Sequence, residues 1–287
     1  MKSGFVVLAG RSNVGKSTLI NALVGTKVAI VTPKPQTTRR PVRGVLHDPR
    51  GQIVFVDTPG LFLGKRDVLS QKLNAIVREQ LEGIDLVVYV MDPTRHAGEE
   101  EEDMRKLMRK LSVPVIAVIN KSDLVDMDKP ALDEMRNADV GQRTTIEISA
   151  TKHHDLNRLV DTMFALLPEG DAYYPEQQLT DISHKEWIAE TIREKCFLRL
   201  EQELPYSVHV EVEEVDQRPD GSRLIEATIW TTDDRYKKML IGAGGAMIKQ
   251  IGMDARKEIE GATGNKCRLE LVVKTDPKWP QRFANVV

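Results

Sequence analysis

Short apolar runs alternate with helix-like apolar spacings through the first 167 residues of the chain. Strands that alternate with helices form a mostly parallel sheet with helices on both faces. Each run ends in a polar cluster, and such sheets bind their ligands at the carboxyl ends of the strands. The pattern therefore predicts an α/β domain over residues 1–168 whose functional residues lie in those clusters. The predicted strands are Phe5–Leu8, Val42–Leu46, Ile53–Val56, Leu86–Val90, Val115–Ile119 and Thr145–Ile148.

The pattern changes in the second half of the chain. Residues 169–180 are rich in turn formers and lack periodicity, which is typical of a linker. Ser183 and Glu186 then form a capping-box pair that opens a helix, and apolar spacing extends this helix to about Leu204. A second domain, residues 181–287, is thus predicted with the order α-β-β-α-α-β. Its other elements are strands at Ser207–Val212 and Leu224–Trp230 around a hairpin turn at Asp216–Gly221, two helices separated by a Gly-rich turn, and a strand at Arg268–Val273.

Length and composition agree with two globular domains. The chain has 287 residues, of which 41% are hydrophobic and 29% charged. Cys196 and Cys267 have no CxxC spacing, which indicates neither a disulfide framework nor a zinc site and favours a cytoplasmic location. The N-terminus does not resemble a signal peptide, and no run approaches the roughly 20 apolar residues of a membrane span.

Charge is unevenly distributed along the chain. The net charge is −2, but residues 236–287 contain ten Lys and Arg against five Asp and Glu, a balance of +5. The preceding residues therefore carry −7, including the acidic run Glu99–Asp103, which is expected to be a solvated helix face. The tail is consequently the half in which anion binding is expected.

A Gly-rich loop follows the first strand and precedes a helical pattern that begins near Thr18. In this context backbone N–H groups can wrap phosphates, and the helix N-terminus adds partial positive charge. Lys16 is expected to reach the β- and γ-phosphates, and the Ser17 hydroxyl is expected to bind Mg²⁺. An ordinary strand-to-helix turn would not account for Gly, Lys and Ser all at the required offsets. The predicted phosphate contacts are Gly10, Arg11, Ser12, Asn13, Val14, Gly15, Lys16, Ser17 and Thr18.

The third strand ends in the sequence Asp57-Thr58-Pro59-Gly60. The Asp57 carboxylate is expected to bind Mg²⁺, mostly through water, and the Gly60 N–H to meet the γ-phosphate. Taken alone the sequence would be a Pro-Gly turn. A hydroxyl-rich segment before the second strand, residues 27–39, is expected to order around the metal and γ-phosphate. Thr37 or Thr38 is its predicted metal ligand, and the sequence does not choose between them.

The ends of the last two strands predict which base is bound. The Asp123 carboxylate can accept from both N1–H and the exocyclic amine of guanine, a donor pair that adenine lacks. Asn120 is expected to hold the loop and contact the ring, and the Lys121 stem to pack over the ring. Ser149-Ala150 is expected to offer a backbone N–H to the guanine carbonyl, with a helix-capping turn as the alternative. A site of buried hydrogen bonds rejects the wrong partner strongly, so GTP is predicted over ATP.

These four motifs resemble the translation-factor-related class of small GTPases over residues Gly4 to Leu167. Many GTPases carry a water-orienting glutamine where this chain has Leu61, and a leucine cannot position water by hydrogen bonding. Either the intrinsic rate is slow until a partner acts, or another group supplies the missing stabilisation. Several members of the class with an apolar residue there use K⁺ beside the phosphates, and Asn13 matches the asparagine associated with that ion. The alternative is that Asn13 only stabilises the loop. The predicted catalytic residues are Lys16, Asn13, Thr37, Thr38 and Gly60.

The basic tail contains a GxxG turn between two predicted helices. Such a turn lets a nucleic-acid backbone approach closely, while neighbouring lysines add charge and isoleucines floor a groove. A lone GxxG would be a helix-capping turn, but in the order α-β-β-α-α-β it resembles a type II KH domain, an α+β fold that clamps single-stranded RNA. The predicted RNA contacts are Lys237, Lys238, Ile241, Gly242, Ala243, Gly244, Gly245, Ile248 and Lys249.

A P-loop GTPase domain followed by a KH domain resembles the Era family of ribosome-assembly GTPases over essentially the whole chain. Further support comes from residues 36–39, 57–61, 203–208 and 238–242. The resemblance implies a GTP/GDP switch that binds 16S ribosomal RNA near its 3′ end and assists assembly of the small (30S) subunit, with a monomer expected. Two alternatives remain: an RNA chaperone with GTP as a structural ligand, and a switch held peripherally on the cytoplasmic face of the inner membrane by its basic tail.

Overall fold

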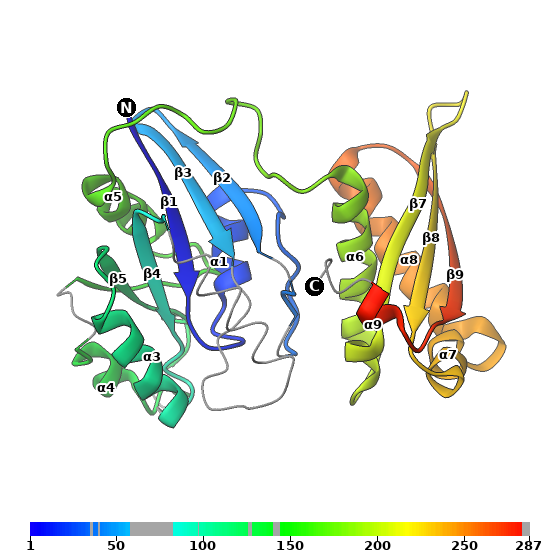
Figure 1. Cartoon of the computed structure of the whole chain (residues 1–287), viewed down its shortest axis with the longest axis horizontal. Helices are drawn as coiled ribbons and strands as arrows, with labels where there is room; N and C mark the ends of the chain where they lie inside the picture. Colours follow the sequence, from blue (N-terminus) through cyan, green and yellow to red (C-terminus); the bar gives the residue numbers. More distant parts are fainter. Residues whose placement is uncertain are drawn as a thin grey trace. The chain divides into compact units, whose positions relative to one another are not determined.

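The computed structural model of the chain describes residues 1–34, 37–39, 41–57, 83–96, 98–125, 128–139 and 144–282. Contacts between Cα atoms divide it into two compact units (Figure 1). The first comprises Met1–Val31 and Thr38–Asp181, and the second comprises Thr32–Thr37 and Ile182–Val287. None of the described helices is both long and apolar enough to cross a membrane.

The first unit is built on a six-stranded sheet with the order β2-β3-β1-β4-β5-β6. Neighbouring strands pair in parallel except β2 and β3, which are antiparallel. This confirms the predicted mostly parallel sheet. The strands are β1 (Lys2–Ala9), β2 (Val42–Asp48), β3 (Gly51–Asp57), β4 (Leu86–Met91), β5 (Val115–Ile119) and β6 (Thr145–Glu147).

Helices cover both faces of this sheet (Figure 1). Along β1, Val6 and Leu8 join one buried cluster with α1 and α5, whereas Val7 and Ala9 join the other with α3 and α4. Successive side chains of a strand point to opposite faces, so a strand buried on both faces must be apolar throughout. The described helices of this unit are α1 (Lys16–Val24), α3 (Glu99–Arg109), α4 (Leu132–Arg136) and α5 (Leu156–Leu166).

The segment predicted as a linker, residues 169–180, is held against the first unit. The Gln52 side chain of β3 accepts hydrogen bonds from the Tyr173 and Tyr174 backbone N–H groups at 2.8 and 3.0 Å. The Thr180 hydroxyl donates to the Arg43 carbonyl of β2 at 2.7 Å. The boundary between the units therefore falls after this segment, between Asp181 and Ile182.

The second unit has the predicted order α-β-β-α-α-β, followed by one short helix, α9, that was not predicted. Its three-stranded sheet has the order β7-β8-β9, with β7–β8 antiparallel and β8–β9 parallel. Ile225 and Ile229 of β8 pack in one core with Ile192 and Ile251 from the two long helices. The elements are α6 (His184–Arg199), β7 (His209–Gln217), β8 (Arg223–Thr231), α7 (Asp234–Ile241), α8 (Ala246–Thr263), β9 (Cys267–Thr275) and α9 (Trp279–Arg282).

The capping box at the start of α6 is confirmed, but the end of the helix was predicted wrongly. The Ser183 hydroxyl accepts from the Glu186 N–H at 3.2 Å. The helix stops at Arg199 because Leu200 is extended, with φ −92° and ψ 150°. Leu204 opens a separate 3₁₀ turn, Leu204–Ser207. Leu204 is buried like the apolar residues of α6 and stands at a helical spacing from them, so the sequence pattern extended the predicted helix past its end at Arg199. As a result, β7 begins at His209 rather than at residue 207.

Candidate functional site

The Gly-rich loop joins β1 to α1, and two of its glycines are required by close contacts. A Cβ at Gly10 would lie 2.4 Å from the Val90 carbonyl oxygen, and one at Gly15 would lie 2.3 Å from Asn120 Nδ2. None of the described side chains caps the N-terminus of α1, which starts at Lys16. Its first N–H groups therefore remain available to an anion.

Lys16 is folded back over this loop. Its side chain is 6% exposed, and Nζ donates to the carbonyls of Gly10 and Arg11 at 3.0 and 2.9 Å. Burial lowers its pKa to about 8, and the nearby Asp57 carboxylate offsets part of this effect. The ammonium is thus placed in the concavity of the loop, where a phosphate would bind.

Three oxygen-bearing side chains meet at the carboxyl end of β3. Ser17 Oγ donates to Asp57 Oδ2 at 2.7 Å, and Thr38 Oγ1 lies 3.3 Å from both of these oxygens. Asp57 is fully buried, burial raises its pKa, and its Oδ1 accepts no hydrogen bond from any described residue. Hard oxygen ligands around an unsatisfied buried carboxylate oxygen suit Mg²⁺.

The two candidate switch threonines are engaged differently. Thr37 Oγ1 lies 2.6 Å from Thr32 Oγ1 and donates to the Lys34 carbonyl at 2.8 Å. Thr38 belongs to the same compact unit as Ser17 and Asp57 and lies within 3.3 Å of an oxygen of each. The geometry therefore favours Thr38 as the metal ligand.

Asn120 ties the loop after β5 to the rest of the site. Its Nδ2 donates to the Val14 carbonyl at 3.0 Å, and its Oδ1 accepts from the Ala150 N–H at 3.0 Å. Asp123 is exposed, and a hydrogen bond from the Ser149 hydroxyl lowers its pKa. It is therefore held as a carboxylate, which accepts hydrogen bonds and cannot donate them.

The backbone N–H groups of Ser149 and Ala150 both have partners within the protein. The Ala150 N–H is bonded to Asn120, and the Ser149 N–H donates to the His154 carbonyl at 3.3 Å. Ser149-Ala150 thus supports Asn120 and Asp123, and its predicted hydrogen bond to the guanine carbonyl stays a prediction. The predicted residues Thr58, Pro59 and Gly60, with Leu61, lie outside the described residues. Asn13 lies in the loop in a left-handed conformation, with φ 62°.

The GxxG turn of the second unit is formed by glycines with positive φ. Gly242, Gly244 and Gly245 have φ of 74°, 58° and 79°. A Cβ at Gly242 would lie 2.9 Å from the Met247 nitrogen, whereas one at Gly244 or Gly245 would meet no described heavy atom within 4 Å. The turn therefore presents bare backbone, directly before α8 begins at Ala246.

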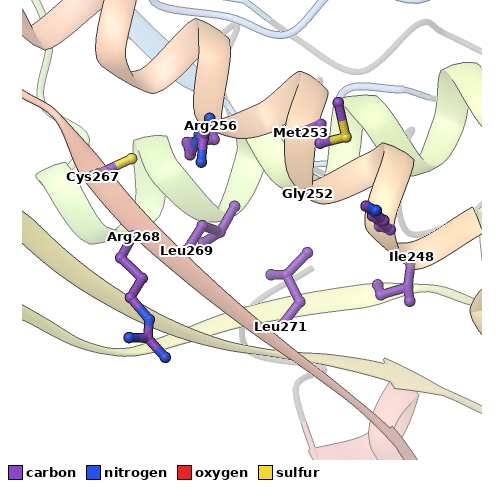
Figure 2. A pocket seen from close by; sticks show the side chains of 9 residues that line it. Ile248, Gly252, Met253, Arg256, Cys267, Arg268, Leu269 and Leu271 are labelled. Carbon is purple, nitrogen blue, oxygen red and sulfur yellow. The ribbon is translucent and has the colours of Figure 1, made fainter. Parts of the chain in front are cut away.

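A groove of about 570 Å³ lies between α8 and β9 (Figure 2). None of Gly242–Gly245 is among its lining residues, which begin on α8 at Ile248. Leu269 and Leu271 point from β9 toward α8 and form its apolar floor. Two of the predicted RNA contacts, Ile248 and Lys249, line it. Lys237, Lys238 and Ile241 are on α7 and are not among the lining residues. The lining residues that sequence reasoning missed are Gly252, Met253, Arg256, Cys267, Arg268, Leu269 and Leu271.

Part of that set carried a signal in the sequence. Residues 248, 252 and 256 are spaced by four and lie on one face of α8. A glycine in a helix interior destabilises the helix by about 1 kcal/mol, so Gly252 calls for a reason such as close approach of a ligand. The residues of β9 gave no comparable signal, because their role depends on pairing with β8 and packing near α8.

The folds of the two units and their sites define a GTPase with a C-terminal KH domain. A family of 50S ribosome-binding GTPases matches residues 5–121, and the KH domain family matches residues 203–280. The chain is 40% identical over 283 residues to GTPase Era of Heliobacterium modesticaldum, covering 98% of this chain and 94% of that protein. It is 42% identical over 284 residues to GTPase Era of Halothermothrix orenii, covering 98% and 95%. The chain therefore belongs to the Era family of GTPases.

Solved structures agree with this assignment. A variant of Aquifex aeolicus Era bound to GDP·AlF4⁻ has a TM-score of 0.91 and 36% identity, covering 100% of this chain and 98% of the other. Era in complex with MgGDPNP and nucleotides 1506–1542 of 16S ribosomal RNA also has a TM-score of 0.91, with 37% identity and coverage of 100% and 97%. The predicted family, fold and GTPase activity are confirmed.

Proposed function

We propose that this GTPase is a cytoplasmic switch that binds 16S ribosomal RNA near its 3′ end and assists assembly of the 30S subunit. The observation that carries the proposal is the bare backbone turn at Gly242–Gly245, which leads into α8, the helix that lines the groove from Ile248 onward. The complex of the similar Era protein with 16S RNA supports the same ligand here.

Different residues of the nucleotide site would bind the phosphates, the base and the metal. The loop backbone and Lys16 would bind the phosphates, and Asp123 would select guanine. Ser17 and Thr38 would hold Mg²⁺, with Asp57 behind them, and the ion when bound neutralises charge on the β- and γ-phosphates. The similar Era structure with MgGDPNP supports this metal. Stimulation by K⁺ near Asn13 stays a prediction.

GTP affinity is expected to weaken about fourfold between pH 7 and pH 8.5. In the nucleotide-free protein Lys16 has a pKa of about 8 and loses its proton over this range, whereas bound phosphates would keep it protonated. Binding at the higher pH must therefore take up a proton. Calorimetric titration in two buffers with different ionisation enthalpies measures that uptake. Equal dissociation constants with no proton uptake would contradict the assignment of Lys16.

The groove can bind unstacked bases between an apolar floor and a basic rim. Leu269 and Leu271 supply the floor, while Lys249, Arg256 and Arg268 supply the positive charge. RNA phosphates would follow the glycine turn, where the N-terminus of α8 adds partial positive charge.

Gly244→Asp is expected to weaken binding of a 3′-terminal 16S RNA fragment at least tenfold, because it places a carboxylate where the phosphates approach. Gly264→Asp is a matched control at the other end of α8. Both glycines have left-handed φ, 58° and 67°, and neither site has a described heavy atom within 4 Å of an added Cβ. The control is expected to bind RNA within twofold of the wild type in fluorescence anisotropy. Equal binding by wild type and Gly244→Asp would refute the proposed site.

Switching is tested with the same RNA in the presence of a GTP analogue or GDP. The proposal expects tighter binding in the GTP-analogue state. Equal binding would favour the RNA chaperone with GTP as a structural ligand. Co-sedimentation with acidic lipid vesicles, but no RNA binding, would favour the peripheral membrane switch.

A further inference from the structure

The carboxyl end of β4 has no role in the sites described so far. In the sheet order β4 lies between β1, which carries the phosphate loop, and β5, which carries the base loop. Asp92 follows β4 directly and is 2% exposed. A buried carboxylate at this position, between two ligand-binding loops, needs charged or hydrogen-bonding partners.

Its partners are Lys121 of the base loop and Thr94 and Arg95 of its own loop, and Arg95 links it to the phosphate loop. Asp92 Oδ2 accepts from Lys121 Nζ at 2.5 Å and lies 3.8 Å from Arg95 Nε. Arg95 Nη1 in turn donates to the Ser12 carbonyl of the phosphate loop at 3.2 Å. The other oxygen, Oδ1, accepts from the Thr94 N–H at 3.0 Å and from its hydroxyl at 2.7 Å.

We propose that Asp92 is a positioning residue for the guanine nucleotide: it anchors the Lys121 ammonium so that the aliphatic stem lies across the base, and through Arg95 it holds the Ser12 carbonyl. The inference rests on the proposed guanine site. A lysine stem is flexible, and fixing its head before the nucleotide arrives removes much of the ordering that binding would otherwise require. A purely structural role would need only the turn that Oδ1 makes with Thr94.

Asp92→Asn separates these roles, because an amide keeps an acceptor for Thr94 but loses the charge that binds Lys121. GDP is expected to dissociate roughly tenfold faster, and the loss in kcat/KM is expected mainly in KM. The matched control is Asp85→Asn, at the start of the same strand, where Oδ2 accepts from the Phe5 N–H at 2.8 Å. Its GDP dissociation rate is expected to stay within twofold of the wild type.

A double-mutant cycle with Lys121→Met decides whether Asp92 acts through Lys121. Methionine keeps an apolar stem and removes the ammonium. The double variant is expected to release GDP no more than about twofold faster than either single variant. Fully additive effects would overturn the proposal. If Asp92→Asn does not fold by circular dichroism, Lys121→Met alone decides: roughly tenfold faster release supports the proposal, and release within twofold of the wild type overturns it.

The Asp123→Asn variant tests the assignment of the guanine site independently of the role of Asp92. If that variant keeps its preference for GTP over xanthosine triphosphate, the guanine site is assigned wrongly. If it changes preference while Asp92→Asn releases GDP at the wild-type rate, only the role of Asp92 is refuted.

Discussion

Lys16→Ala is expected to weaken GTP binding at least a hundredfold and to abolish measurable hydrolysis. The wild-type ammonium is buried in the loop concavity, bonded to the Gly10 and Arg11 carbonyls. It can transfer these bonds to two phosphates without leaving its place. Hydrogen bonds that involve charged groups contribute about 1.5–3 kcal/mol each, so losing two removes about 3 kcal/mol or more. Titration with a fluorescent GTP analogue and phosphate-release kinetics measure the two effects.

Lys2→Ala is the matched control for this variant. Lys2 starts β1, at the end of the strand far from the loop, and its Nζ donates to the Leu167 carbonyl at 2.7 Å. The control therefore also removes a hydrogen-bonded lysine ammonium from the same unit. It is expected to bind GTP like the wild type. Nucleotide should raise the melting temperature of the control but not of Lys16→Ala, because only a ligand that binds the folded state stabilises it. GTP binding by Lys16→Ala within tenfold of the wild type would contradict the role of Lys16.

The nucleotide half could be predicted largely from sequence because each part of it leaves a local mark. A strand covered on both faces must be apolar throughout, as β1 is from Phe5 to Ala9. The loop requires glycine at 10 and 15 because any Cβ there would collide with Val90 or Asn120. Because β1, β3, β5 and β6 are parallel, the motifs that follow them all lie at the same edge of the sheet.

Other features depend on contacts that adjacent residues do not reveal. Thr37 and Thr38 are neighbours of the same type, and only the distances to Ser17 and Asp57 distinguish them. Asp92 lies between the phosphate loop and the base loop because β4 pairs with β1 and β5 in the sheet. The sequence does not show this pairing, since β2 and β3 separate β1 from β4 along the chain. Leu200 and Leu204 are both buried although neither lies in α6, so apolar spacing alone could not show that α6 ends at Arg199.

Asp123→Asn is expected to change the base preference of the protein from guanine to xanthine. The carboxylate of Asp123, kept ionised by the hydrogen bond from Ser149, can accept from both N1–H and the exocyclic amine of guanine. An asparagine amide would turn one N–H donor toward that amine, leaving two donors facing each other, whereas xanthine offers a carbonyl at the same position. Discrimination built on such bonds commonly reaches 10⁴-fold or more, so GTP affinity is expected to fall at least a hundredfold.

Competition of GTP and xanthosine triphosphate against a fluorescent analogue measures this change. Asp128→Asn, an exposed position five residues further along the chain, makes the same chemical substitution and is expected to keep the wild-type preference. Loss of GTP binding without gain of xanthosine triphosphate would mean that Asp123 only supports its loop. An unchanged preference in Asp123→Asn would mean that other groups recognise guanine.

Asn120 cannot replace Asp123 in this role. Its Nδ2 already donates to the Val14 carbonyl, and its Oδ1 already accepts from the Ala150 N–H, so it has no pair of acceptors for the two guanine donors. The Asp123 carboxylate is therefore the group on which we expect the choice of GTP over ATP to depend.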